Sequence, residues 1–233
     1  MNGLTLPNHL GIILDGNRRW AIAHGLKPWE GHRYGAKKFE EFLKWCAELG
    51  IPQVSAYVLS TENLDRPKKE LDELFRLLHR YLEKWSKDES LFEKYEIKVR
   101  FIGDLSRLPP RLVKLMGIIM RKTAKYQKKI LNVMIAYGSK FELTHAMKKI
   151  LEKAIKVGRI EITEKDIEAN LLVPVPIDCL IRTGGEKRLS NFLLWQAAYA
   201  ELIFIDKFWP DFSKEDLIRC IEEFNRRQRR FGR

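Results

Sequence analysis

Short apolar runs alternate along the chain with longer segments in which apolar residues recur at helical intervals. Continuous apolar runs of this length are typical of strands that are buried on both faces of a sheet. The pattern predicts strands at Gly11–Leu14, Val54–Leu59, Ile97–Ile102, Ile130–Ala136, Ile177–Ile181 and Leu202–Ile205. Because strands and helices alternate, we expect one α/β domain over residues 1–233, with a mainly parallel six-stranded sheet flanked by helices.

The segments between these runs place apolar residues three and four positions apart, which predicts helices. A helix is expected directly after the first strand, and the others are Tyr34–Leu49, Leu71–Trp85, Leu112–Met120, Phe141–Ala154, Glu164–Leu171, Asn191–Tyr199 and Ser213–Arg227. The broad apolar face of Leu71–Trp85 has two interpretations, which are core packing and one wall of an apolar ligand cavity. Ser213, with Asp216 three residues later, is typical of a helix N-terminal cap.

Polar and glycine-rich segments follow several predicted strands, and they are rich in arginine. The residues concerned are Asp15, Gly16, Asn17, Arg18 and Arg19 after the first strand, Ser60, Asn63 and Arg66 after the second, and Arg182, Arg188 and Ser190 after the fifth. Because the carboxyl ends of parallel strands share one edge of the sheet, we expect these groups to converge there. Their charge predicts a large anion site.

The segment Asp15–Arg19 combines groups that suit a metal-bound phosphate. Asp15 offers a hard oxygen ligand of the kind that Mg²⁺ prefers. Arg18 and Arg19 offer forked donors for phosphate oxygens, and Gly16 lets the backbone approach a ligand closely. We expect a site for a magnesium-bound phosphate or diphosphate; a strand-to-helix turn with solvated charges is the alternative that these residues alone leave open.

The net charge is strongly positive, which indicates an anionic binding partner but does not identify it. The chain of 233 residues carries a formal net charge of +12, and five positive charges lie in the C-terminal arginines Arg226, Arg227, Arg229, Arg230 and Arg233. A basic balance fits a phosphorylated substrate, an anionic membrane surface or nucleic acid, and it does not choose among them. The sequences GxxxxGK[ST] and GxGxxG after a strand are both absent, so nucleotide sites of those two kinds are not indicated.

The cysteine content indicates a reducing compartment. Cys46, Cys179 and Cys220 are far apart and form no CxxC pair, so neither a disulfide framework nor a zinc site is indicated. We therefore expect a cytoplasmic protein. Residues Met1–Leu10 show no signal-peptide pattern, and no apolar stretch approaches the ~20 residues of a membrane span.

Several blocks of sequence, in a fixed order over nearly the whole chain, resemble those of one enzyme family. The blocks are Leu14–Ala21, Gly31–Gly35, Ser60–Pro67, Ile181–Glu186, Arg188–Gln196 and Tyr199–Leu202. Together they resemble the cis-prenyltransferases of the undecaprenyl diphosphate synthase type. Members of that family condense isopentenyl diphosphate onto an allylic diphosphate primer and make each new double bond cis.

The resemblance implies roles for individual residues. It implies that Asp15 is the catalytic magnesium ligand, that Ser60 and Asn63 help proton loss from the incoming unit, and that Glu201 is a second acidic residue linked to the metal. The residues that it places at the primer diphosphate are Gly16, Asn17, Arg19 and His32. Arg18, Trp20 and Arg66 are further expected substrate-binding residues. Those that it assigns to isopentenyl diphosphate are Arg182, Arg188 and Ser190. Glu201 precedes a predicted strand, so the strand pattern does not require it to lie at the same sheet edge as Asp15.

The resemblance also implies a Mg²⁺-dependent homodimer whose product grows in an apolar tunnel between sheet and helices. The expected product is a long-chain polyprenyl diphosphate that serves as a lipid carrier for glycan synthesis. The primer, farnesyl or geranylgeranyl diphosphate, and the product length stay open. Peripheral contact with a membrane for product release is expected, and nucleic acid is not an expected partner. The tail Arg230-Phe231-Gly232 resembles a family ending that reaches across the dimer; a frayed basic terminus is the alternative.

Some positions depart from the family pattern, and other functions remain as alternatives. Pro28 stands where bacterial members often have arginine, which leaves the primer preference open. Non-catalytic partner subunits occur in the family but lose the aspartate, whereas this chain keeps Asp15. A nucleic-acid binder is supported only by the net charge. The trans-prenyl synthases are excluded because the chain has no DDxxD sequence.

Overall fold

The structure, a computed structural model, describes residues 4–158 and 161–227. Within these residues six strands form one sheet in the order β3-β4-β2-β1-β5-β6, and every neighbouring pair is parallel. The strands are β1 His9–Ile13, β2 Gln53–Ser60, β3 Ile97–Ile102, β4 Lys129–Tyr137, β5 Cys179–Arg182 and β6 Glu201–Phe204. All six expected strands are confirmed; Ile97–Ile102 has the expected ends, and the ends of the others differ by one or two residues.

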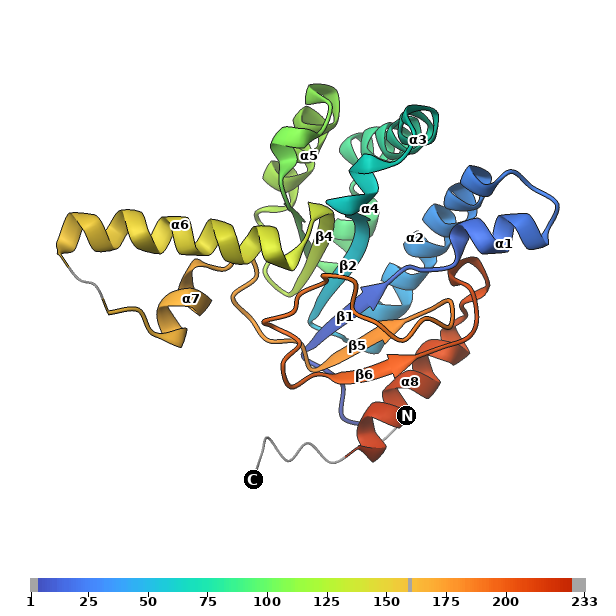
Figure 1. Cartoon of the computed structure of the whole chain (residues 1–233). Coiled ribbons are helices and arrows are strands. Elements are labelled where there is room, and N and C mark those ends of the chain that lie inside the picture. Colours follow the sequence, from blue (N-terminus) through green and yellow to red (C-terminus); the bar gives the residue numbers. More distant parts are fainter. Residues whose placement is uncertain (1–3, 159–160, 228–233) are drawn as a thin grey trace.

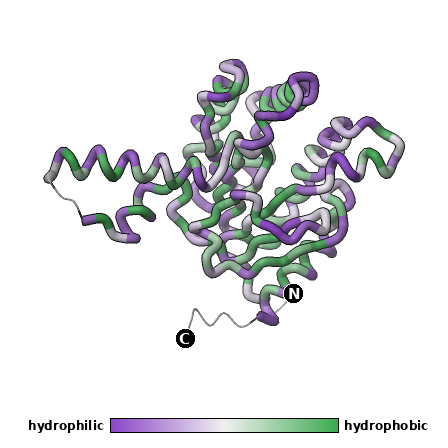
Figure 2. Tube along the Cα trace, in the orientation of Figure 1, coloured by the Kyte–Doolittle hydropathy of each residue, from purple (hydrophilic) through white to green (hydrophobic). Residues whose placement is uncertain are grey.

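The main helices connect these strands (Figure 1). They are α1 Asn17–Ala23, α2 Gly31–Leu49, α3 Lys68–Lys87, α4 Ser90–Tyr95, α5 Pro110–Thr123, α6 Ser139–Val157, α7 Glu164–Asn170 and α8 Lys214–Arg226. Figure 1 shows α6 and α7 reaching away from the sheet, and Figure 2 shows hydrophilic and hydrophobic residues alternating along α6. The cap expected at Ser213 is confirmed, because its hydroxyl accepts from the Asp216 N–H and the Asp216 carboxylate accepts from the Ser213 N–H.

The two faces of the sheet are covered in different ways. On one face, buried residues of α2, α3, α4, α5 and α8 join those of the strands in the larger hydrophobic core. On the other face, residues 171–200 supply most of the covering side chains, including the fully buried Phe192 and Leu193. The fold class is thus the expected one, but an irregular segment replaces much of the second helical layer.

The expected helix Asn191–Tyr199 does not form, and this prediction is wrong. The segment consists of turns, and Ser190, Asn191 and Leu193 have positive φ angles of 49°, 65° and 43°. Its main chain bonds to other parts of the fold instead, since Ile177 N donates to Gln196 O. Adjacent Phe192 and Leu193 are both fully buried against the sheet, and tertiary packing of this kind overrides local helical periodicity.

The apolar face of α3 packs in the core and also lines a cavity. Leu74, Leu82 and Trp85 are buried in the larger core. The same three residues line a cavity that is described below. Its lining also includes Leu77, Leu78 and Tyr81. Within the described residues, the structure contains no helix that is both long and apolar enough to cross a membrane. The expected role of Arg230-Phe231-Gly232 concerns positions outside the described residues.

Candidate active site

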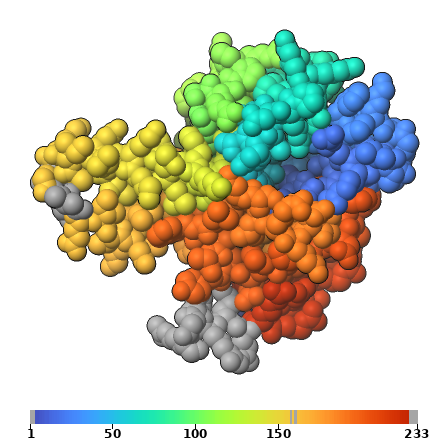
Figure 3. Space-filling view, viewed as in Figure 1, coloured from blue at the N-terminus to red at the C-terminus, as the bar shows by residue number. Residues whose placement is uncertain are grey.

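The strand register brings the polar segments together at one edge of the sheet. Ile13, the last residue of β1, lies beside Tyr57 of β2 on one side and beside Arg182 of β5 on the other. The chain therefore leaves all three strands at the same edge, and Asp15, Ser60 and Arg182 lie around one cavity. Figure 3 shows the surfaces of these segments adjoining at one face of the molecule.

Asp15 is held by contacts from both its main chain and its side chain. Its backbone carbonyl accepts from the Thr183 hydroxyl at 2.7 Å and from the Trp209 N–H at 3.0 Å. Its carboxylate accepts from Arg182 Nη2 at 2.8 Å and lies 3.3 Å from Arg19 Nη2. The side chain remains 27% exposed, so the carboxylate faces the cavity and is open to a ligand.

Gly16 is required by the turn between β1 and α1. Its φ of 104° lies in the left-handed region, which side chains rarely adopt. A Cβ at this position would also lie 2.7 Å from Cδ1 of Phe208. The turn sends the chain directly into α1, which carries Asn17, Arg18 and Arg19 along the cavity.

Carboxylates hold the arginines of the site in two groups. Glu70 on α3 accepts from Arg66 at 3.1 Å and lies 3.4 Å from Arg18, so both guanidiniums stand side by side. Glu186, after β5, is paired with both Arg19 and Arg188. Desolvation and the neighbouring Arg18 both lower the pKa of Arg66, although Glu70 opposes this.

His32 and Asn17 present buried polar atoms that have no hydrogen-bond partner among the described residues. These atoms are His32 Nε2 and Asn17 Oδ1, and both residues line the cavity. A buried polar group without a partner costs free energy, so such atoms indicate a position that a ligand or water completes. Burial lowers the pKa of His32 to about 4, and the positive charges of Arg66 and Arg18 add to the effect.

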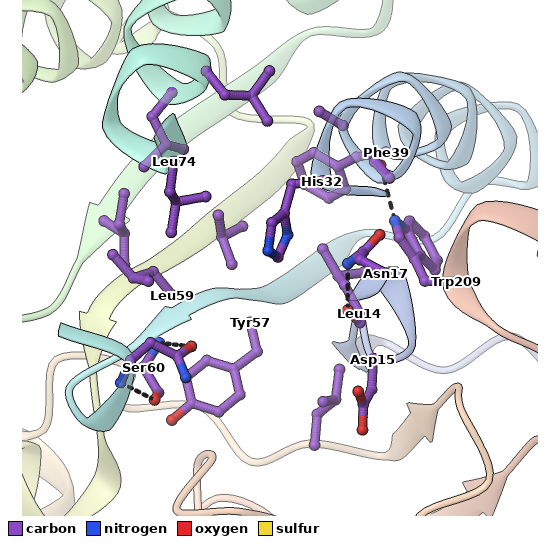
Figure 4. Close-up of a pocket in the computed structure, with 18 of the residues that line it drawn as sticks. Leu14, Asp15, Asn17, His32, Phe39, Tyr57, Leu59, Ser60, Leu74 and Trp209 are labelled. Atoms are coloured by element: carbon purple, nitrogen blue, oxygen red, sulfur yellow. Dashed lines mark hydrogen bonds between the residues drawn. The ribbon is translucent and has the colours of Figure 1, made fainter. Parts of the chain in front are cut away.

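Ser60 and Asn63 fix each other at the end of β2. The Ser60 N–H donates to Asn63 Oδ1, and the Asn63 N–H donates to Ser60 Oγ, both at 3.1 Å. Figure 4 shows Ser60 and Asp15 toward one side of the cavity, while Leu74 and Phe39 lie on the opposite side. The two sides therefore offer different chemistry.

The cavity has a polar end and an apolar end. Its volume is about 640 Å³, within the range usual for small-molecule sites. The apolar end is lined by residues of α2, α3 and the strands, namely Phe39, Leu59, Leu74, Leu78, Leu82, Trp85, Phe101, Val133 and Ile135. This arrangement suits a ligand with an anionic head and a hydrocarbon tail.

Comparison with known proteins identifies the family. The family model Prenyltransf, which describes undecaprenyl diphosphate synthases, matches residues 13–232. The chain belongs to the undecaprenyl diphosphate synthase family. It is 47% identical to the tritrans,polycis-undecaprenyl-diphosphate synthase (geranylgeranyl-diphosphate specific) of Methanopyrus kandleri, over 98% of this chain and 85% of the relative. It is 45% identical to the isoprenyl transferase of Aquifex pyrophilus, over 99% of this chain and 97% of that relative.

Solved structures of the same family agree with this membership. Lavandulyl diphosphate synthase from Lavandula x intermedia, solved with dimethylallyl diphosphate, matches with a TM-score of 0.91 at 33% identity, covering 97% of this chain and 98% of its own. A probable undecaprenyl diphosphate synthase from Campylobacter jejuni matches with a TM-score of 0.81 at 36% identity, over the full length of both chains. As a member of the undecaprenyl diphosphate synthase family, the protein is a transferase of prenyl groups, and the resemblance found in its sequence is confirmed.

Most of the expected site residues of this prenyltransferase line the cavity. They are Asp15, Gly16, Asn17, Arg18, Arg19, His32, Ser60, Asn63, Arg66, Arg182, Arg188 and Ser190. Trp20 is not among the lining residues. Its indole lies on the other side of α1, where it donates to Asp211 at 2.7 Å and stacks on His24.

Glu201 does not join Asp15. It is the first residue of β6 and lies opposite Cys179, the first residue of β5, whereas Asp15 lies beyond the last residue of β1. Glu201 instead accepts from Arg227 at 3.2 Å. Glu201 therefore lies at the amino ends of the parallel strands, and Asp15 lies at their carboxyl ends. This register rules out a metal site shared by Asp15 and Glu201 of one chain.

Glu70 and Trp209 belong to the site but were not expected there from the sequence. Glu70 pairs with Arg66 and Arg18, and Trp209 holds the main chain of Asp15. Thr183 and Glu186 belong to the segment after the fifth strand, which was expected at this edge; Thr183 holds the Asp15 main chain and Glu186 pairs with Arg19. The spacing of Arg66 and Glu70, four residues apart on a helix, is a signal that could have indicated their pairing. Trp209 carries no such signal, because only the fold brings it to the end of β1.

We expect His32 to make the protein less stable in acid. Its pKa of about 4 in the folded state lies below the ordinary 6.5, so the unfolded state binds more protons between these values. Stability that is present above pH 6.5 should therefore be lost as the pH falls toward 4. Replacing His32 with Asn should reduce the change in unfolding free energy with pH by up to about 1 kcal/mol per pH unit. Urea unfolding of both proteins between pH 7 and 4.5 measures this pH dependence, and an equal dependence in the two proteins would contradict the prediction.

Proposed function

We propose that this prenyltransferase condenses isopentenyl diphosphate repeatedly onto an allylic diphosphate primer, with each new double bond cis. The observation that carries the proposal is the joining of an arginine-rich edge to an apolar cavity in one site. The arginines suit two diphosphate heads, and the apolar end suits the hydrocarbon of the primer and of the growing product. The expected product is a long-chain polyprenyl diphosphate.

The primer diphosphate would bind between α1 and the loop that follows β2. Arg18, Arg19 and Arg66 offer charged donors, each worth about 1.5–3 kcal/mol to a phosphate oxygen. His32 is neutral at pH 7 while its pKa is about 4, and its unpartnered Nε2 supplies one further donor in the tautomer that carries the proton there. We propose geranylgeranyl diphosphate as the primer, because relatives that are 47% and 46% identical to this chain are named as geranylgeranyl-diphosphate specific.

Isopentenyl diphosphate would bind at the segment that follows β5. Arg182 is nearly buried and already oriented, since its guanidinium donates to Ser190 Oγ at 2.9 Å and to the Arg188 carbonyl. The Arg188 side chain is 59% exposed and forms a surface ion pair with Glu186. Such pairs are worth about 1 kcal/mol or less, so a diphosphate can displace Glu186 at little cost.

Asp15 is suited to bind Mg²⁺ together with the substrate. Protein sites often hold this ion through one or two carboxylates, while phosphate oxygens and water complete the shell. The carboxylate of Asp15 faces the cavity among arginines that would hold those phosphates, which fits a site of this kind. When bound, Mg²⁺ would stabilise the negative charge that develops on the leaving diphosphate.

The chain's own residues would do three things during the reaction. The arginines hold two mutually repelling diphosphates side by side, so that the allylic carbon lies near the isopentenyl double bond. As the allylic C–O bond breaks and the new C–C bond forms, the same preoriented donors stabilise the departing diphosphate. Ser60 and Asn63 would assist loss of the proton that restores a double bond. Each added unit then gains several kcal/mol on burial, at ~0.8 kcal/mol per CH₂-sized group.

We propose that the protein acts as a homodimer and that its product serves as a lipid carrier for glycan synthesis. The hydrocarbon chain of a polyprenyl diphosphate is strongly apolar, so peripheral contact of the protein with a membrane would speed release of the product. A non-catalytic partner subunit is disfavoured, because Asp15 and the surrounding arginines are all present at the cavity.

The activity can be tested with the purified chain. Incubation with Mg²⁺, labelled isopentenyl diphosphate and geranylgeranyl diphosphate should give butanol-extractable label, and excess EDTA should abolish it until Mg²⁺ is restored. Thin-layer separation of the dephosphorylated products gives the chain length for each primer. If no extractable label forms with geranylgeranyl, farnesyl or dimethylallyl primers, the proposed function is wrong.

Replacing Asp15 with Asn should lower kcat at least about 100-fold, since it removes the one carboxylate placed to hold the metal. The side chain keeps its shape, so the fold should persist by circular dichroism. Asp65→Asn is the matched control, because that side chain is 80% exposed and its ion pair with Arg107 is long, at 3.8 Å. Near-normal turnover in the Asp15 variant would remove the metal assignment.

Replacing Arg188 with Ala should raise the KM for isopentenyl diphosphate about 10- to 100-fold, the effect of losing one charge-assisted hydrogen bond. The KM for the primer should stay near that of the wild type. Lys187→Ala, at the adjacent exposed position, is the control. Steady-state kinetics with each substrate varied in turn decides the matter, and an unchanged KM for isopentenyl diphosphate would refute the role.

A further inference from the structure

The segment that carries Ser190 has an unusual backbone. Ser190 and Asn191 adopt φ angles of 49° and 65°, and Leu193 adopts 43°. Residues other than glycine rarely adopt this left-handed region, and each instance costs free energy that the surrounding structure must offset. Phe192 and Leu193 anchor the segment in the smaller core, where the Phe192 ring stacks on Tyr57 with a centroid distance of 4.5 Å.

Asn191 connects this segment to two other loops. Its Nδ2 donates to Glu62 Oε1 at 2.8 Å, and its Oδ1 accepts from the Lys140 N–H at 2.9 Å. Its backbone carbonyl accepts from the Ser139 N–H at 2.7 Å. One residue thus joins the segment after β5 to the loop after β2 and to the start of α6.

The fold makes room for this carboxamide. A Cβ at Gly138 would lie 2.5 Å from Asn191 Nδ2 and 2.7 Å from the Thr61 hydroxyl. Only glycine therefore lets the end of β4 pass so close to Asn191. Because asparagine also tolerates positive φ better than most residues, its side chain and its backbone both suit this position.

The residues beside Asn191 are those that face the diphosphate. Ser190 Oγ accepts from Arg182, and the Ser190 carbonyl accepts from the Tyr57 hydroxyl at 3.3 Å. Glu62 lies between Ser60 and Asn63 in the loop after β2. The carboxamide of Asn191 therefore ties the segment that would hold isopentenyl diphosphate to the loop that would assist proton loss.

We propose that Asn191 is a positioning residue for isopentenyl diphosphate: it holds Ser190, and with it the diphosphate, in register with the Ser60–Asn63 loop. This inference rests on the proposed function. Asn191 acts through Ser190 and Glu62 and requires no contact with the substrate. The primer diphosphate would lie at α1, which Asn191 does not contact through its side chain, so its loss should affect the two substrates unequally.

The test uses Asn191→Gly, since glycine accepts the φ of 65° and the variant removes only the carboxamide. The KM for isopentenyl diphosphate should rise about tenfold, because Ser190 is no longer held in the position that binds the diphosphate. The KM for the primer and kcat should stay within about twofold of the wild type. A merely structural role would instead lower the active fraction, and thus kcat, without separating the two KM values.

Partner variants check the contact with Glu62. Glu62→Gln keeps an acceptor oxygen for Asn191 and should behave like the wild type, whereas Glu62→Ala should raise the KM for isopentenyl diphosphate several-fold. The effects of Glu62→Ala and Asn191→Gly should not add fully, because both remove the same bond. Asn170→Gly, far away on α7, is the matched control and should leave both KM values unchanged.

Calorimetric titration with isopentenyl diphosphate separates this inference from the proposed function. A wild-type chain that forms no product, yet binds isopentenyl diphosphate more tightly than Asn191→Gly, would overturn the elongation activity and retain the positioning role. Equal affinity of the two proteins, or a primer KM that rises as much as that for isopentenyl diphosphate, would overturn the positioning role.

Discussion

The buried guanidinium of Arg182 is the interaction on which the rest of the site depends. It lies at the end of β5, is 4% exposed, and donates to the carboxylate of Asp15 at the end of β1. It also donates to Ser190 and to the carbonyl of Arg188. Removing one partner of a buried ion pair typically costs about 3–5 kcal/mol, because the other charge is left uncompensated. The pair therefore fixes the loops after two adjacent strands relative to each other.

The cavity of the site has a charged end and an apolar end. The charged end lies where parallel strands stop and their loops diverge, and the apolar end lies between the sheet and α3. The carboxylates of Glu70 and Glu186 each hold two arginines close together at the charged end. A prenyltransferase needs this division, because its substrates carry several negative charges on one end and only hydrocarbon on the other.

The strands and most helices could be predicted because their apolar residues follow a period that is set locally by backbone geometry. The segment Asn191–Tyr199 could not be predicted in this way. Its apolar residues also fit a helical spacing, but Phe192 and Leu193 pack into the sheet and Asn191 bonds to two distant loops. Contacts between segments far apart in sequence outweighed a weak local preference there.

The sequence by itself determined the alternation of strands and helices, the parallel sheet, and the arrival of Asp15, Ser60, Asn63, Arg182 and Arg188 at one edge. These follow from the strand period and from the direction of the chain, which a sequence contains. Only the tertiary structure decided that Trp20 faces away from the cavity, that Glu201 lies at the opposite edge from Asp15, and that Trp209 holds the Asp15 main chain. Those outcomes depend on helix rotation, on strand register and on loop packing, which are properties of the whole fold and not of a local stretch of residues.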